Sequence, residues 1–449
     1  MPTCQGKATE TSRTDTFAAF VGIDWADKEH AICVLDGDQN TSDQLKHSAE
    51  AIDAWATRMH QQFGGRPVAV AIEQSRGGLF HALMQYEHLR LFPINPKQAA
   101  NYRKALACSG AKSDPADAHM LARFLREHHD QLRPWEGDTA ETRRIAALCE
   151  LRRKIVEARK SEAQRLGSML KLYFPQAIDL VGPLHGPLAL ELLGRWPTLK
   201  KLQRANPKTL QKFFRQHGQR NDEKIKEQVQ QIRAFRHLTK DAAIIEPTAL
   251  YVGLLIKQIE QFNEAIAEFE KQLDAAFSKH EDAAIFRSLP GAGEALASRL
   301  LAAMGSERER FSEAKEVQAY CGIAPVTRRS GQACRVSMRR ACPKFIRQTF
   351  HEFADQARRW SAWSKAYYEQ LRGQGKRHHA AVRALAFKWI RIIFRMWKTR
   401  TPYDENRYQQ QLQRRNSPPS KIPPQPLTKT SDVYDAPLYP AFAAHYRGG

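Results

Sequence analysis

Several signatures of common protein classes are missing from this sequence. Its seven cysteines are scattered and include no C-x-x-C pair, which excludes the usual zinc-finger spacing. It has no apolar run of about 18 residues, so we expect no transmembrane helix. The first fifteen residues lack the apolar core of a signal peptide. These absences favour a protein of a reducing, cytoplasmic compartment.

Acidic residues are also scarce relative to basic ones. The chain has 70 Lys and Arg against 48 Asp and Glu, a formal net charge of +22. Such an excess favours a polyanionic partner, most often nucleic acid, although a merely soluble basic surface gives the same count. At 449 residues the chain is long enough for two or three domains.

One short stretch, Lys112 to His119, carries two carboxylates three residues apart, Asp114 and Asp117. Residues at i and i+3 lie on one helical face, so both side chains can reach one Mg²⁺ ion. The alternative is a helix start, with Asp114 as the N-cap before Pro115 and Asp117 favouring the positive end of the helix dipole.

Two further acids end predicted strands. The segment Phe20 to Asp24 reads as a strand that forms a hairpin with Ala31 to Leu35, and Pro67 to Glu73 reads as a buried central strand. A helix over 79–88, a strand over 90–95 and a helix over 96–104 follow, which favours an α/β layer with parallel strands. A metal site at the carboxyl edge of such a sheet would draw on Asp24 and Glu73.

These motifs together resemble a known family. Gly22-Ile-Asp24-Trp-Ala, Ala71-Ile-Glu73-Gln-Ser and Lys112-Ser-Asp114-Pro-Ala-Asp117-Ala are similar to segments of the DEDD transposases of bacterial insertion sequences, insertion-sequence family one-ten, whose best-known members are bridge-RNA-guided recombinases. The resemblance implies an α/β RuvC-like (RNase-H-type) N-terminal domain. Its four carboxylates, Asp24, Glu73, Asp114 and Asp117, would be catalytic and would bind Mg²⁺ or Mn²⁺.

The same resemblance implies partners and a location. DNA at the element ends and at the target, a noncoding guide RNA, and other copies of the chain in a dimer or tetramer are expected. The expected location is the bacterial cytoplasm, in association with the nucleoid.

The middle of the chain has a helical pattern. A long helix is expected from Thr139 to Leu172. Apolar residues from Leu255 to Ala276 then alternate spacings of four and three, a heptad seam. This seam fits either an amphipathic helix packed within one chain or an intermolecular coiled coil, and the resemblance favours the second.

The sequence Leu289-Pro-Gly-Ala-Gly293 lies between two predicted helices and is typical of a helix-hairpin-helix. Gly291 and Gly293 would let the backbone approach a phosphate, which the amides of a helix starting near Glu294 would receive. A tight packing turn between the helices is the alternative.

A second candidate site surrounds Ser330. Between Arg328 and Arg347 there are seven Lys or Arg and no acid. An unactivated serine is a weak nucleophile, but neighbouring arginines can stabilise a phosphoryl group during displacement. The block resembles the family's C-terminal transposase domain, which implies that Ser330 is a nucleophile forming a covalent phosphoserine with DNA. Ser337 is the second candidate, and the segment after Gly331 departs from the common family pattern. The residues expected to contact nucleic acid are Lys112, Gly291, Gly293, Arg328, Arg329, Arg335, Arg339 and Arg340.

The predicted domains follow from these elements. Residues 1–16 are expected to be disordered, 17–135 to form the RuvC-like DEDD domain and 136–285 a helical spacer with a coiled coil. Residues 286–402 are expected to form a mainly α-helical C-terminal transposase domain, with helices over 344–368 and 380–398, and 403–449 a Pro-rich disordered tail.

The predicted function is that of a DNA transposase or recombinase. Two alternatives stay open on the residues alone: a metal-dependent, junction-resolvase-like nuclease that uses Ser330 only for phosphate contact, and a non-enzymatic nucleic-acid-binding protein.

Overall fold

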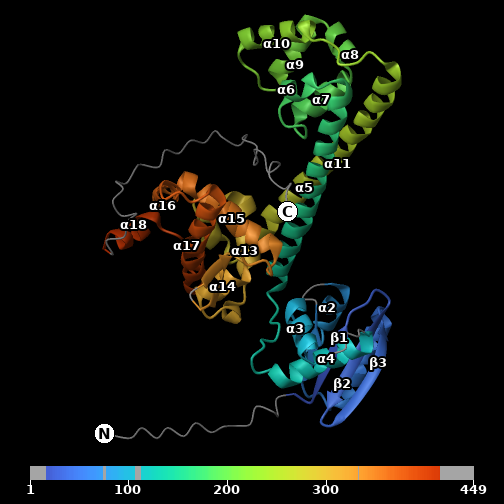
Figure 1. Cartoon of the computed structure of the whole chain (residues 1–449), viewed down its shortest axis with the longest axis vertical. Helices are drawn as coiled ribbons and strands as arrows, with labels where there is room; N and C mark the ends of the chain where they lie inside the picture. Colours follow the sequence, from blue (N-terminus) through green and yellow to red (C-terminus); the bar gives the residue numbers. More distant parts are fainter. Residues whose placement is uncertain (1–16, 74–76, 107–112, 332, 415–449) are drawn as a thin grey trace. The chain divides into compact units, whose positions relative to one another are not determined.

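The computed structural model describes residues 17–73, 77–106, 113–331 and 333–414. The chain divides into two compact units, residues 1–137 and 138–449, which are considered separately below (Figure 1).

The first unit is built on a five-stranded mixed sheet. Its strands are β1 (Ala19–Asp24), β2 (Glu29–Asp36), β3 (Gln39–Lys46), β4 (Val68–Ile72) and β5 (Leu89–Pro93), in the order β3-β2-β1-β4-β5. The strands β1 to β3 are antiparallel, and β4 pairs parallel with both β1 and β5. The predicted hairpin and central strand are therefore confirmed. The sheet is not wholly parallel, because tight turns join its first three strands.

Helices cover both faces of this sheet. Side chains alternate along β1, so Val21 and Ile23 face α1 (Ala49–Gln62) and α2 (Gly78–Leu83), in one buried cluster around Trp55. The other face, with Ala69 and Ala71 of β4, packs against α4 (Asp114–His128), and α3 (Pro96–Leu106) lies beside α4. The expected helix over 79–88 ends early, since α2 stops at Leu83.

The second unit begins with a long antiparallel helix pair (Figure 1). Helix α5 (Ala140–Tyr173) packs along α11 (Ala242–Ser278). Thr139 caps α5, accepting a hydrogen bond from the Thr142 amide, which confirms the predicted start. Between these two helices come α6 (Gln176–Val181), α7 (Pro187–Arg195), α8 (Leu199–Arg204), α9 (Pro207–Gln216) and α10 (Asp222–Ala234).

The predicted heptad seam is internal to the chain. Leu255, Ile259, Ile266 and Leu273 of α11 are all buried within this single chain. Across the helix pair, Arg159 donates to the Asn263 side chain at 2.8 Å. The seam therefore packs against α5 within one chain, as the first of the two interpretations held.

By length and composition α11 is also apolar enough to cross a membrane, unlike any other helix in the described residues. The sequence did not predict this property, because Glu246, Lys257 and Glu260 interrupt the apolar residues of the helix. One such helix is weak evidence for a span, since the core helix of a soluble protein passes the same test, and seven residues of α11 are buried in protein.

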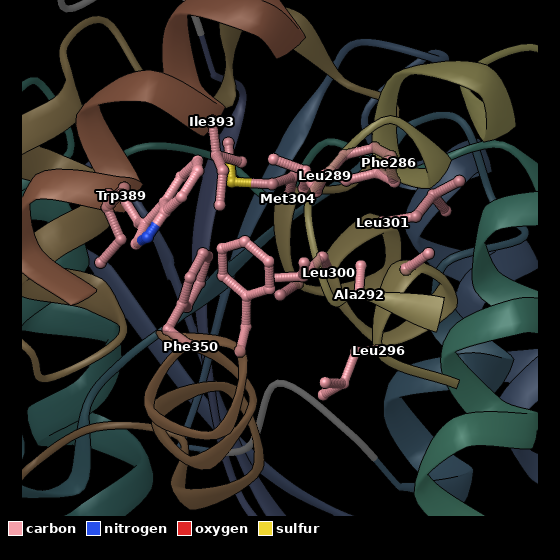
Figure 2. Close-up of a cluster of buried hydrophobic side chains, with 14 of the residues drawn as sticks. Phe286, Leu289, Ala292, Leu296, Leu300, Leu301, Met304, Phe350, Trp389 and Ile393 are labelled. Carbon is pink, nitrogen blue, oxygen red and sulfur yellow. The ribbon is translucent and has the colours of Figure 1, made fainter. Parts of the chain in front are cut away.

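The rest of the unit is a helical domain carrying one hairpin. It comprises α12 (Ala283–Arg287), α13 (Gly293–Met304), the short 3₁₀ helix η2 (Arg308–Arg310), α14 (Ala314–Tyr320), β6 (Val326–Ser330), β7 (Ala333–Ser337), α15 (Lys344–Trp360), α16 (Ala362–Gly373), α17 (His378–Thr399) and α18 (Glu405–Arg414). Figure 2 shows side chains of α13, α15 and α17 meeting in one buried cluster, with Leu300, Phe350 and Trp389 among them.

Two predicted boundaries in this domain are wrong. The expected helix over 344–368 breaks at Ser361, whose hydroxyl caps α16 by accepting from the Ser364 amide. The tail expected from residue 403 contains the helix α18, and the Tyr403 hydroxyl accepts from Trp363 at 2.8 Å and donates to Glu405 at 2.7 Å. The remainder of that predicted tail, residues 415–449, lies outside the described residues. Such side-chain contacts with distant helices leave no local pattern in the sequence.

Candidate functional site

Two of the four predicted acids lie at the carboxyl edge of the sheet. Asp24 is the last residue of β1, and Glu73 directly follows β4. The two strands are parallel, with Ile23 opposite Ile72, so the two acids occupy adjacent positions of the register. By strand alternation both lie on the face that α4 covers, and both are half-buried. The structure thus gives Asp24 and Glu73 neighbouring positions at one edge of the sheet.

A close backbone approach fixes α4 on that face. A Cβ atom added at Gly22 would lie 2.0 Å from the Ala118 carbonyl oxygen and 2.4 Å from the Ala122 amide nitrogen. Only glycine permits this contact, because no backbone atom can yield such space. Gly22 precedes Asp24 by two residues, and Ala118 directly follows Asp117. The first turn of α4 is thereby held against the strand that ends in Asp24.

Asp117 is almost fully buried, with 3% of its surface exposed, and it forms an ion pair with Arg103 of α3 at 2.8 Å. A buried carboxylate needs such a partner, because desolvation otherwise disfavours its charge. Asp114 is exposed at the start of α4. The N-cap of that helix is Ser113, so the interpretation of Asp114 as the N-cap is wrong, although both acids lie in the first turn.

The four acids do not form a ready-made ligand cluster. Among the described residues, no three His, Cys, Asp or Glu side chains lie close enough together to hold a metal ion. Their carboxylate oxygens are nevertheless the hard donors that Mg²⁺ and Mn²⁺ prefer. The donor chemistry at this edge therefore fits such an ion, while the geometry pairs Asp117 with Arg103 instead. Lys112 lies outside the described residues.

Ser330 lies at the tip of an exposed two-stranded hairpin. It ends β6 and pairs with Ala333 of β7, with Gly331 in the turn between the two strands. Gly331 has a φ of +54°, the left-handed conformation that such turns require. Directly paired residues point to the same face, so Ser330 shares one face with Arg328 and Arg335.

The hairpin carries two arginines at directly opposed positions. Arg328 lies directly opposite Arg335, and both are exposed. Like charges at directly opposed positions destabilise a sheet, and a lone two-stranded hairpin is at best marginally stable. Neither arginine has an acidic partner in the part of the chain that the structure describes. An anion between them would remove the repulsion, and a phosphate group has the required charge and hydrogen-bond-accepting oxygens.

The two candidate serines are well separated. Ser337 pairs with Val326 at the base of the hairpin, where its hydroxyl lies 3.5 Å from the Val326 carbonyl oxygen. Four residues of extended strand place the two ends about 13 Å apart. Ser330 therefore lies at the exposed tip of the hairpin, whereas Ser337 lies at its base, where the hairpin joins the helical domain.

The segments just before and just after the hairpin pack tightly against each other. A Cβ at Gly322 would lie 2.3 Å from Cys342 Sγ, and Gly322 has a φ of +70°. Arg347 of α15 donates to the Arg339 carbonyl oxygen at 3.3 Å and approaches the same sulfur at 3.5 Å. Of the predicted contact residues here, Arg339 is half-buried and Arg340 exposed.

The predicted helix-hairpin-helix turn joins α12 to α13. Both Gly291 and Gly293 have positive φ angles, +73° and +53°. A Cβ at Gly291 would lie 2.5 Å from Trp360 Cδ1, so this glycine serves packing, as the alternative interpretation held. No atom lies within 4 Å of a Cβ at Gly293, so its backbone is open to an approaching group. Figure 2 shows Leu289 and Ala292 beside this turn in the buried cluster, which fixes the loop in place.

Sequence reasoning missed two residues that shape the acidic edge. Arg103 lies in the last turn of α3, where a basic residue reads as an ordinary helix end. Gly22 lies inside a strand, and an isolated glycine there can signal a close backbone approach. That signal was present in the sequence, whereas nothing local links Arg103 to Asp117.

Comparison with known proteins places these motifs in a family. Residues 21–175 match the transposase family DEDD_Tnp_IS110, and residues 283–369 match the transposase IS116/IS110/IS902 family. The mini-circle putative transposase for IS117 from Streptomyces coelicolor is 30% identical over 88% of this chain and 97% of its own length. An IS900 insertion-element protein of Mycobacterium paratuberculosis is 25% identical over 86% of this chain and 96% of its own. An IS110 insertion-element protein of Streptomyces coelicolor is 23% identical over 87% and 96%. The chain therefore belongs to the IS110/IS116/IS902 family of insertion-sequence transposases.

Proposed function

We propose that this transposase cuts and rejoins DNA strands with Ser330 as its nucleophile, assisted by the acids at the sheet edge. The observation that carries the proposal is the place of Ser330, exposed at a hairpin tip and on the same face as two opposed arginines. This arrangement offers a hydroxyl beside a site for a phosphate group.

The proposed reaction is a displacement at phosphorus. The Ser330 oxygen forms a bond to the phosphorus atom as the bond to one nucleotide oxygen breaks. The serine loses its proton, and the released nucleotide oxygen gains one. The resulting phosphoserine ester retains the energy of the broken bond, so a second nucleotide hydroxyl can displace the serine and rejoin the strand.

Arg328 and Arg335 would neutralise the phosphate during this displacement, and Arg329 and Arg340 would contact neighbouring phosphates. The open backbone at Gly293 would accept a phosphate at the start of α13. Lys112, which lies outside the described residues, stays a predicted contact to nucleic acid.

The acids would hold a divalent ion. Asp24, Glu73 and Asp117, joined by Asp114, would supply its oxygen ligands, and Arg103 would have to release Asp117. A bound Mg²⁺ or Mn²⁺ ion supplies Lewis-acid polarisation of a phosphate oxygen. The strand order, with three antiparallel strands followed by two parallel ones, supports a RuvC-like, RNase-H-type domain for this role.

Assembly and guidance belong to the same proposal. Since the heptad seam is buried within the chain, a dimer or tetramer would need another surface. Leu250 and Leu254 of α11, 80% and 50% exposed, form an apolar strip for it, with Ile244 nearby in sequence. A noncoding guide RNA would suit the net charge of +22.

The decisive experiment traps the covalent intermediate. Ser330→Ala should bind element-end DNA normally but form no protein–DNA adduct resistant to denaturant. Ser337→Ala is the matched control and should form the adduct. An adduct that survives Ser330→Ala would refute the assignment and leave Ser337 as the next candidate.

A second arm tests the acids. Asp117→Asn should abolish strand cleavage, and Asp27→Asn, an exposed turn acid, should not. Metal-dependent cleavage without any adduct would identify a nuclease of the junction-resolvase type instead. Binding without cleavage under every metal condition would favour a non-enzymatic nucleic-acid-binding protein. Mixing Ser330→Ala with Asp117→Asn subunits should restore activity if two chains share one site.

A further inference from the structure

A second basic surface lies in a part of the chain outside both family matches. Those matches cover residues 21–175 and 283–369, whereas residues 192–221 lie between them. This thirty-residue stretch contains eight Lys or Arg and no Asp or Glu. Its basic residues are Arg195, Lys200, Lys201, Arg204, Lys208, Lys212, Arg215 and Arg220.

Folding turns these cations outward. Helix α9 buries Leu210, Phe213 and Phe214 in the cluster that it shares with α5 and α11. Lys208 and Lys212 are exposed on its other side, one helical turn or about 6 Å apart.

Helix α8 behaves in the same way. It buries Leu199 and Leu202, and exposes Lys200, Lys201 and Arg204. We call the exposed cations of α8 and α9 the α8–α9 surface. It comprises Lys200, Lys201, Arg204, Lys208, Lys212 and Arg215.

Almost none of this charge is compensated within the protein. Within the described residues, Arg215 pairs with Asp222 at 2.9 Å, and the other five cations of the surface have no acidic partner. The neighbouring helix α10 mixes acids with its lysines, so the excess is confined to α8 and α9. Five unpaired cations on two short helices repel one another, and a polyanion would relieve that repulsion.

The surface is also rigid. Gln203 donates to the carbonyl oxygens of Ile232 and Phe235 at 3.0 and 2.9 Å. Arg233 donates to the Ala205 carbonyl oxygen at 2.6 Å, and Asn206 caps α9. These bonds tie the α8–α9 connection to the end of α10, so the lysines project from a fixed scaffold that binding need not order.

The aromatic residues indicate which nucleic acid fits. Single strands are bound by exposed aromatic rings on which the bases stack. Here Trp196, Phe213 and Phe214 are all buried, so no ring is offered. Lysines and arginines alone bind the phosphate backbone without reading sequence, which suits a duplex.

We propose that the α8–α9 surface binds the phosphate backbone of double-stranded DNA, independently of sequence. The choice of DNA rests on the proposed function above. The buried sides of α8 and α9 pack in a hydrophobic core at one end of the α5–α11 pair, around Leu166 and Val252. The helical domain that carries the Ser330 hairpin has its own core at the other end of the pair, around Ile145 and Phe277. The α8–α9 surface would therefore hold duplex apart from the Ser330 hairpin, as an additional contact.

The test uses the full chain with three lysines neutralised: Lys201→Gln, Lys208→Gln and Lys212→Gln. The matched control neutralises three exposed lysines outside the surface, Lys224→Gln, Lys226→Gln and Lys240→Gln. Affinity for a fluorescent 30-base-pair DNA of arbitrary sequence is measured by anisotropy over a series of salt concentrations. Thermal melting confirms that both variants remain folded.

The surface triple should bind duplex DNA about tenfold or more weakly, with the slope of log affinity against log salt reduced by roughly three. The control should keep the wild-type slope. Equal losses in the two triples, or no loss in the surface triple, would overturn the proposal. So would a loss confined to duplex RNA of the same length, which would make RNA the partner.

A separate readout distinguishes failure of this proposal from failure of the proposed function. At DNA concentrations high enough to saturate binding, the surface triple should still form the Ser330 adduct. If no adduct forms even in the wild-type chain, the anisotropy result still decides whether this surface binds duplex.

Discussion

The acidic edge of the first unit and the Ser330 hairpin of the second are positioned in opposite ways. Asp24, Glu73 and Asp117 are placed by buried structure: two parallel strands in register, and a helix in backbone contact with one of them. Ser330 lies on a hairpin whose every residue from Thr327 to Ser337 that the structure describes is exposed. The acids therefore depend on the folding of their own unit, whereas the hairpin carries a charge repulsion that a bound anion would relieve. The fold of the first unit thus sets the positions of these acids, whereas the hairpin has no comparable buried support.

Among the substitutions that test this difference, Gly22→Ala should have the largest effect, on the stability of the first unit. The new methyl group would collide with backbone atoms of α4, and we expect the first unit to lose about 3 kcal/mol of stability or to misfold. Urea denaturation followed by tryptophan fluorescence measures this. Gly253→Ala is the control, since a Cβ there meets no atom within 4 Å, and it should be neutral or stabilising. An unaltered denaturation midpoint for Gly22→Ala would show that α4 does not lie against β1.

A smaller loss is expected at the base of the hairpin from Gly322→Ala. The added methyl group would meet Cys342 Sγ and adopt an unfavourable positive φ, at a cost of about 2 kcal/mol. Gly375→Ala, with a φ of +79° and no neighbour within 4 Å, isolates the backbone part of this cost. Adduct formation should fall with Gly322→Ala and persist with Gly375→Ala. Equal adduct yields from the two variants would mean that the contact with Cys342 does not hold the hairpin.

A lower pH should reduce the stability of the helical domain that carries the hairpin, because His351 of α15 is half-buried there. Burial, helped by His379 and Arg383, lowers the pKa of His351 from 6.5 to about 4. The unfolded chain binds a proton at His351 near pH 6.5, and the folded chain binds it only near pH 4. The contribution of neutral His351 to the free energy of unfolding is therefore complete above pH 6.5 and is lost as the pH falls toward 4. We expect a loss of about 1–2 kcal/mol between pH 7 and 5. In thermal melts over that range, His351→Leu should show a flatter slope than the wild type, and an identical slope would exclude His351 as the source.

The smallest expected effect concerns the opposed arginines. Arg335→Ala should relieve repulsion from Arg328 and stabilise the free hairpin by a few tenths of a kcal/mol. It should weaken DNA binding about uniformly across sequences and reduce the salt slope by about one. Hydrogen exchange of the hairpin amides, with and without DNA, measures both effects. Slower exchange in the free wild type than in the variant would contradict the repulsion.

Much of the fold could be predicted because it leaves periodic patterns. The apolar run of β4 and the spaced apolar residues of α5 identified both elements. Strand β3 and helix α1 were not predicted. Strand β3 has one buried residue, Leu45, and a polar edge strand carries no alternating apolar signal. Helix α18 was assigned to the tail because its ordering depends on contacts such as those of Tyr403 and Glu405.

The sequence by itself determined which chemistry is present: four acids at element ends, a serine among arginines, and thirty residues with cations and no acid. These follow from residue type and short spacing, which the chain carries before it folds. Only the tertiary structure decided what each group faces. It paired Asp117 with Arg103. It packed Gly291 against Trp360 and left the backbone at Gly293 open. It also packed the heptad seam of α11 against α5. The physical reason is that burial and ion pairing join residues distant in the chain, and their energies depend on distances that no local pattern encodes.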